Sequence, residues 1–176
     1  LIFQGVTPVV GGTEAEALAK KEEYLQHISI IGGLVHMSGS SGVDLGSVDL
    51  DIPLKEVKVE AMKGTIESLI ASNPNKKWTL RDLAKSTSSG NFLAGTPEQI
   101  ASVFQKWFDA GIDGLNIVYA VTPGTFSEFI DGVIPELRKR GLSQSEYQVG
   151  TLREKLFGMP RLSDRHPAAN YRGAFK

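Results

Sequence analysis

The side chains of this sequence best suited to acid–base chemistry are its histidines, because an imidazole exchanges its proton near neutral pH. His36 lies in the Gly- and Ser-rich stretch GGLVHMSGSSGVDL, whereas His27 lies on a predicted helix and His166 in the C-terminal tail. We interpret His36 as the candidate catalytic residue, and the alternative is a loop histidine that is bonded locally. The histidines are scattered and the carboxylates lack ligand spacing, so we expect no metal site.

Three other features have both a chemical and a structural interpretation. The segment SGSSG, Ser38 to Gly42, is rich enough in glycine to surround a phosphate, but it lacks the lysine and the strand-to-helix setting of known phosphate loops, so we expect a flexible lid. Gly95 and Thr96 precede a helix whose N-terminus could bind an anion, although Thr96 is expected to cap that helix. Tyr119 ends the last predicted strand and is a candidate for the wall of a substrate pocket, with core packing as an equal alternative.

Composition excludes several classes of function. The 176 residues are 41% hydrophobic and 22% charged with a net charge of -1, so no nucleic-acid partner is expected. No apolar run approaches the roughly 20 residues of a membrane span, so no membrane association is expected. The start, LIFQGVTPVV, lacks the basic region of a signal peptide. There is no cysteine, and we expect one domain with a cytoplasmic location as the default.

The chain opens with a strand followed by a helix. Residues 2–12 read as a strand that ends in glycines, and Pro8 within it suggests a bulge or a bend. Thr13 and Glu16 form a capping box for a helix that is expected to run to about Ile31. Leu18, Leu25 and Ile28 are expected on its buried stripe.

The next 60 residues have weaker periodicity. Residues 32–53 are rich in Gly, Ser and Asp, and we expect a long loop there. Helices are predicted at Val59 to Ala71 and at Thr79 to Ser86, and a second loop is predicted at STSSGN, residues 86–91.

The C-terminal half shows the clearest patterns. Thr96, Pro97 and Gln99 predict a helix start, and the run from Leu115 to Val121 predicts a strand that is buried on both faces, as in a parallel sheet. Phe126 to Gly141 predicts an amphipathic helix that is kinked or limited by Pro135, and Thr151 to Gly158 a short capped helix. The apolar positions expected to face inward are Ile100, Phe104, Trp107, Phe108, Phe129, Ile130, Val133, Ile134 and Leu137.

These elements predict an α/β architecture with two parallel strand–helix units, an insertion and a tail. Two parallel strands do not make a stable sheet, and a closed eight-stranded barrel typically takes about 250 residues. We therefore expect the chain to hold only part of such a fold.

Several stretches are similar to one family. GTPEQIASVFQKWFDAGIDGLNIV, PGTFSEFIDGVIPELRKRG and TLREKLFG resemble the C-terminal portion of the bacterial luciferase-like flavin monooxygenases. The resemblance is to the branch that contains nitrilotriacetate, dibenzothiophene-sulfone and long-chain alkane monooxygenases. IFQGVTPVVGGTEAEA resembles the seventh barrel strand and the start of its helix, and the tail LFGMPRLSDRHPAANYR looks most like the alkane-monooxygenase type.

The resemblance implies part of a (β/α)8 TIM barrel, namely its last two strand–helix units. Residues 1–31 would be strand seven and its helix, and 32–91 an insertion near the active-site mouth. Residues 92–141 would be a helix, strand eight and a helix, and 142–176 a C-terminal extension. His36 falls where related alkane monooxygenases have an active-site histidine.

The implied activity is that of a two-component monooxygenase. Such enzymes take reduced FMN from a separate flavin reductase and use it with O2 to oxygenate a small organic substrate; most of their flavin contacts come from the N-terminal part of the barrel. A homo-oligomer is also implied. The alternative hypothesis is a non-catalytic flavin- or partner-binding subunit that is built on a truncated barrel.

Overall fold

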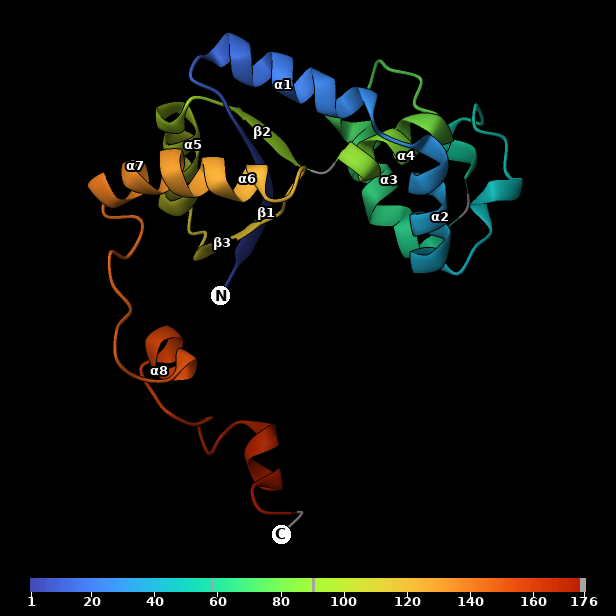
Figure 1. The fold of residues 1–176 in the computed structure, drawn as a ribbon. Coiled ribbons are helices and arrows are strands. Elements are labelled where there is room, and N and C mark those ends of the chain that lie inside the picture. The colour runs from blue at the N-terminus through green and yellow to red at the C-terminus, as the bar shows by residue number, and fades with distance from the viewer. Residues whose placement is uncertain (58, 90, 175–176) are drawn as a thin grey trace.

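The centre of the protein is a small sheet of three parallel strands. The computed structural model describes residues 1–57, 59–89 and 91–174. In it, β1 (Phe3–Val10) lies between β2 (Phe92–Gly95) and β3 (Gly114–Ile117), as Figure 1 shows. The expectation that the first and last predicted strands are parallel is confirmed, and the two are neighbours, although the last strand ends at Ile117 rather than Val121. The register pairs Thr7 with Phe92, Val10 with Gly95, Phe3 with Gly114 and Val6 with Ile117.

The expectation of two strand–helix units is wrong, because β2 is a third parallel strand that comes between the other two in sequence. Residues 92–141, which were expected to begin with a helix, therefore begin with a strand. β2 has four residues, FLAG, and two of them are small. Such a short segment has no measurable alternation, and its pairing with β1 is a long-range contact that local patterns do not reveal.

Pro8 is accommodated in the central strand by the stagger of its two neighbours. The N–H of Thr7 bonds to Asn91 O at 2.9 Å on the β2 side, so the neighbouring Pro8 nitrogen faces the β3 side. Pairing with β3 ends at Val6, where Val118 N–H donates to Val6 O at 2.8 Å. Proline has no N–H with which to continue the ladder on the β3 side, so that pairing stops here, whereas the register with β2 runs without a bulge from Thr7 to Val10.

Helices on either side of the sheet bury its apolar side chains. α1 (Glu14–Gln26), α5 (Pro97–Asp109), α6 (Gly124–Glu128) and α7 (Ile134–Lys139) surround it in Figure 1. A π-helical turn at Phe129–Val133 separates α6 from α7 just before Pro135, which agrees with the predicted kink. The buried core of this half consists of Val6, Val10, Ile100, Ala101, Phe104, Phe129, Val133 and Leu137.

Some apolar positions predicted to face inward are exposed. The exposed fraction is 50% for Leu18, 56% for Phe108 and 57% for Ile130. In α1 the buried residue is Ala17, whose backbone nitrogen lies 2.5 Å from the position that a Cβ on Gly11 would occupy. That approach brings the backbone of α1 against the end of β1, so a small residue replaces the predicted leucine there.

Residues 30–89 form a helical layer with a core of its own. The expected long helix ends at Gln26, and α2 (Ile30–Ser41) begins after a short break, so the loop expected from residue 32 is mostly helical. α3 (Lys63–Ser72) agrees with its prediction, whereas α4 (Leu80–Ser89) extends through most of the loop predicted at 86–91, whose Gly90 lies outside the described residues. Short 3-10 turns at Leu45–Ser47, Leu54–Glu56 and Glu60–Met62 connect them. The buried residues are Leu34, Met37, Leu45, Leu54, Val59, Ile66, Leu80, Leu83 and Ala84.

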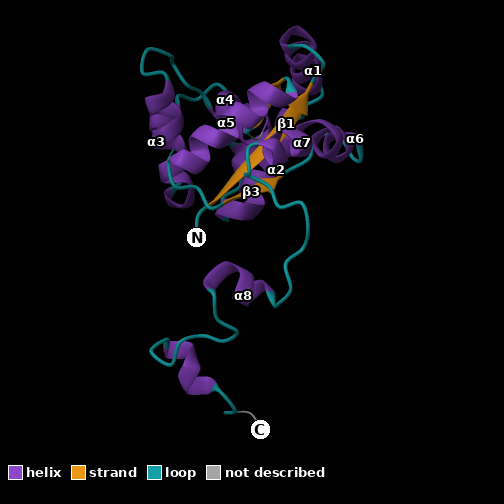
Figure 2. Ribbon diagram, turned by 90° about the vertical axis from the view of Figure 1, so that its left-hand side faces the viewer, coloured by secondary structure: helices purple, strands orange, loops and turns teal. Residues whose placement is uncertain are grey.

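The C-terminal segment extends away from both cores in the views of Figures 1 and 2. It contains α8 (Leu152–Phe157) and a 3-10 turn at Pro167–Tyr171. Thr151 and Glu154 form the capping box of α8, and Gly158 ends it in the left-handed region with φ 70°.

Candidate functional site

A cleft of about 620 Å³ opens where the sheet meets the helical layer. Its walls come from the middle of β1, the end of α1, the end of α4, the start of β2 and the turn after β3. These segments are far apart in sequence and meet through the strand pairing and the packing of α1 on the sheet. The lining residues are Thr7, Tyr24, His27, Ile28, Ser29, Thr87, Phe92, Val118, Tyr119, Ala120 and Val121.

Thr7 places a hydroxyl at the base of the cleft. The residue is 3% exposed, and its side chain has no hydrogen-bond partner within the described residues. No fully buried side-chain oxygen or nitrogen in the described part of the chain lacks a partner. The Thr7 hydroxyl is therefore accessible from the cleft, where it can bind a polar atom of a ligand.

Thr125 fixes the turn that carries Tyr119. Its side chain is buried, and its hydroxyl accepts hydrogen bonds from Ala120 N at 3.2 Å and from Val121 N at 3.1 Å. The Tyr119 ring then lies 5.8 Å from the Phe126 ring, centroid to centroid, at an angle of 54°. Tyr119 is 58% exposed and lines the cleft, so it is a wall residue of this cleft and not a residue of the core.

Paired charges lie beside the cleft, at the end of β1. Lys20 Nζ donates to Glu128 Oε1 at 2.7 Å and to Val10 O at 2.9 Å, which ties α1 to α6. Burial raises the pKa of the neighbouring Tyr24 hydroxyl, and the positive charge of Lys20 partly opposes that increase. Tyr24 is therefore neutral at physiological pH and is available as a hydrogen-bond donor at this end of the cleft.

His36 lies on α2 and not in a loop. Ser29 caps this helix by accepting from Gly32 N at 3.0 Å, and Gly42 ends it at φ 71°. Leu34 and Met37 face the core of the helical layer, so His36 lies on the exposed side of the helix. The imidazole has no hydrogen-bond partner within the part of the chain that the structure describes.

The structure does not bring the two predicted site residues into one cavity, because Tyr119 lines the cleft and His36 does not. His27, interpreted as a surface or packing residue, lies in the lining instead. Thr7, Tyr24 and Thr125 were not identified from the sequence. The only local signal among them is Thr125, which follows a Pro-Gly turn, since Thr7 and Tyr24 reach the cleft through tertiary contacts.

The other predicted features take structural roles. Ser38 to Ser41 form the last turn of α2, and a helix C-terminus carries negative partial charge, which is unsuitable for phosphate. Thr96 caps α5 in a capping box with Gln99, as predicted. Within residues 1–57, 59–89 and 91–174 no group of acidic or histidine side chains is arranged to hold a metal ion. None of the helices described is both long and apolar enough to cross a membrane.

Several known proteins that are similar to this chain are named as monooxygenases. Dimethyl-sulfide monooxygenase of Hyphomicrobium sulfonivorans is 40% identical over 180 aligned positions, which cover 99% of this chain and 38% of the relative. Long-chain alkane monooxygenase of Geobacillus thermodenitrificans is 37% identical over 174 positions, covering 97% of this chain and 36% of the relative. No family model matches the chain.

Solved structures agree with these similarities. The crystal structure of DmoA from Hyphomicrobium sulfonivorans superimposes with a TM-score of 0.77 over 99% of this chain and 38% of that structure, at 40% identity. A riboflavin lyase structure with modified FMN and riboflavin superimposes with a TM-score of 0.77 at 28% identity, covering 96% of this chain and 38% of that structure. The chain thus spans well under half the length of these proteins. Along nearly its whole length the chain is thus related to luciferase-like monooxygenases, whose fold is the TIM barrel.

Proposed function

We propose that this chain is the C-terminal part of a monooxygenase that uses reduced FMN and O2 to oxygenate a small organic substrate. One oxygen atom enters the substrate and the other leaves as water, with two electrons from the reduced flavin. The observation that carries this proposal is 40% identity to dimethyl-sulfide monooxygenase along 99% of the chain. A separate flavin reductase would supply the reduced FMN, and the assembled enzyme would be a homo-oligomer.

The cleft supports a role in binding an uncharged ring or substrate. Its lining contains aromatic rings, hydroxyls and one imidazole, and no lysine or arginine is among the lining residues. Phe92 and Tyr119 can contact a flat ring, and Thr7 can donate a hydrogen bond to it. A flavin ring fits these residues, whereas a phosphate group finds no cation among them. We therefore assign ring or substrate contacts to this chain and do not assign phosphate contacts.

His36 would act from the exposed side of α2. A histidine with an unengaged imidazole can hold or transfer a proton at near-neutral pH. Ile31 and Val35 lie beside it on the same exposed side of the helix. An apolar surface next to a free imidazole suits a helix that covers a substrate pocket, and this supports the role that the resemblance implies.

The experiment that tests the proposal follows one oxygen atom. The complete protein that contains this chain is mixed with chemically reduced FMN and 18O2, in the presence of dimethyl sulfide or a long-chain alkane, the substrates named for two relatives. We expect one 18O atom in the product, and no label when 18O is supplied only as water. Binding of reduced FMN with no labelled product from a broad substrate panel would favour the non-catalytic subunit. Intact mass gives an independent check, because a mass more than twice 19.0 kDa is expected for the enzyme.

Tyr119 provides a matched pair of variants for the cleft. Removing its ring in Tyr119→Ala deletes a wall that is 58% exposed, so KM should increase by about tenfold with little loss of folding stability. Tyr147→Ala removes the same side chain from the tail, where it is 88% exposed and does not line the cleft, and should leave KM unchanged. Equal effects of the two substitutions would remove Tyr119 from the binding site.

A further inference from the structure

A second cavity, of about 340 Å³, lies in the helical layer at the start of α4. One part of its lining is apolar and includes Leu54, Ile70, Pro74 and the Trp78 indole. The rest is polar and carries three lysines, Lys55, Lys76 and Lys77. An apolar surface beside clustered positive charge is the arrangement that binds a molecule with an apolar body and an anionic end.

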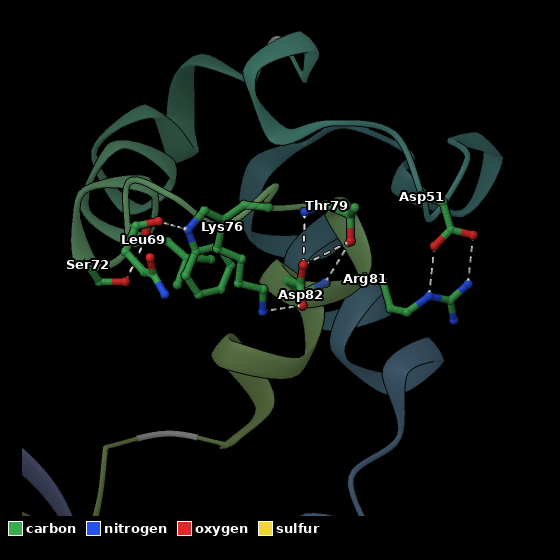
Figure 3. A network of polar contacts seen from close by, with 9 residues as sticks. Asp51, Leu69, Ser72, Lys76, Thr79, Arg81 and Asp82 are labelled. Carbon is green, nitrogen blue, oxygen red and sulfur yellow. Dashed lines mark hydrogen bonds and ion pairs between the residues drawn. The ribbon is translucent and has the colours of Figure 1, made fainter.

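Hydrogen bonds hold this cavity in shape. The Trp78 indole N–H donates to Asn73 O at 3.0 Å, and the Lys76 ammonium lies 4.0 Å from the centroid of the indole ring. Asp82 accepts from Thr79 N at 3.1 Å and from Lys76 Nζ at 2.8 Å, as Figure 3 shows. The turn between α3 and α4 is therefore bonded to the first turn of α4, and the indole has a fixed place in the wall.

The charges around the cavity do not cancel. Asp82 neutralises Lys76, and Arg81 binds the cavity-lining Asp51 through two hydrogen bonds of 3.0 and 3.2 Å. Lys55 and Lys77 have no ion-pair or hydrogen-bond partner within the described residues. Two ammonium groups thus remain uncompensated beside an apolar wall.

From this geometry we infer that the helical layer binds a small amphiphilic carboxylate. Its apolar body lies against Leu54, Ile70, Pro74 and Trp78, and its carboxylate lies between the Lys55 and Lys77 ammonium groups. A neutral molecule of the same shape would leave both cations without a partner, so the site selects for the anion.

This site is separate from the cleft beside Tyr119. α4 connects the two, because Thr79 at its start lines the second cavity and Thr87 near its end lines the cleft. Eight residues of helix separate these positions by about 12 Å. The inference does not depend on the proposed oxygenation, since it uses no residue of the cleft.

Calorimetric titration of the complete protein with 2-naphthoate tests the inference, with 2-naphthalenemethanol as the uncharged comparison. The double variant Lys55→Gln/Lys77→Gln removes both free charges and should weaken naphthoate binding by about fivefold or more. The control, Lys85→Gln/Lys106→Gln, removes two exposed lysines that do not line the cavity and should leave the affinity unchanged. Raising the salt concentration should weaken binding to the unmodified protein and have less effect on the first double variant.

Trp78 tests the apolar wall. Trp78→Leu should weaken naphthoate binding by about tenfold, whereas Trp78→Phe retains a ring and should have a smaller effect. Circular dichroism of each variant separates loss of the site from loss of the fold. Absence of naphthoate binding at millimolar concentration would overturn the inference. Equal affinity in the two lysine double variants, both folded, would also overturn it, and so would equal affinity for the alcohol.

Discussion

Replacing Thr125 by valine keeps the shape of a buried side chain and removes one oxygen atom. Thr125 is 2% exposed, and its hydroxyl accepts from the backbone N–H groups of Ala120 and Val121 at 3.2 and 3.1 Å. A view based on burial alone predicts that valine stabilises the protein, because it is more apolar. The hydrogen bonds predict the opposite sign, since the substitution leaves two partly buried N–H groups without an acceptor.

The expected magnitude follows from those two groups. A buried donor that loses its partner costs about 1–3 kcal/mol, and water can reach a partly buried one, so we take about 1.5 kcal/mol for each. Burying a methyl group in place of the hydroxyl returns about 1 kcal/mol. The net expectation is a decrease of about 2 kcal/mol in the free energy of unfolding. Thr125→Ser keeps the oxygen and loses a methyl group, which should cost about 1 kcal/mol.

Urea denaturation of the three proteins, followed by circular dichroism, measures these differences. The order of stability should be threonine, then serine, then valine. A valine variant as stable as the unmodified protein would refute the reasoning, because the turn would then not depend on the Thr125 hydroxyl. A second measurement follows Tyr119, whose ring contact with Phe126 depends on the same turn: near-ultraviolet circular dichroism should change for valine and not for serine.

Three further predictions concern His36, Asp82 and Phe108. In the complete protein, His36→Ala should retain reduced-FMN binding, slow the transfer of oxygen to the substrate by about 10²–10⁴-fold and raise the release of hydrogen peroxide. An unchanged amount of product per flavin oxidised in a single turnover would exclude an acid–base role for His36. Burial would raise the pKa of Asp82, but hydrogen bonds from Lys76 and Thr79 lower that pKa below its ordinary value. The ionised Asp82 carboxylate therefore stabilises the fold fully above the unfolded pKa near 4, and this stabilisation is lost as the pH falls through the folded pKa. Acid titration of Trp78 fluorescence should therefore show a transition below pH 4 that Asp82→Asn reduces. Phe108 is 56% exposed and lines an apolar cavity together with residues of β3, so the isolated chain should bind a naphthalene-sulfonate dye. Phe108→Glu should reduce that binding, and equal dye signals would place the exposed apolar surface elsewhere.

Elements with local signals could be predicted from the sequence. The capping boxes that begin at Thr13, Thr96 and Thr151 each precede a helix in the structure, because the donors and acceptors of a cap lie within four residues of each other. The first and last strands were correctly predicted to be parallel, but the preference of successive parallel strands to be neighbours does not account for their pairing, since β2 lies between them in sequence.

α2 and β2 could not be predicted, for different physical reasons. α2 contains Gly32, Gly33 and Gly39, which disfavour a helix locally, and the burial of Leu34 and Met37 in the helical layer compensates. β2 is too short for any periodicity. Exposed Phe108 and Ile130 show a further limit, since an apolar stripe indicates which face is ready for burial but not whether another layer covers it.

The candidate site was predictable only in part, because its walls belong to two separate cores. Thr7 and the turn at residues 118–121 belong to the sheet, whereas Thr87 belongs to α4, whose Leu83 and Ala84 are buried in the helical layer. The bond from Thr7 N to Asn91 O, 2.9 Å long, holds the residue before β2 against β1 beside the cleft. Close packing transmits a change of volume in a core to the elements around it. A cavity-forming substitution in the helical layer should therefore move α4 and alter the cleft without removing any ligand contact, so the shape of the site depends on both cores.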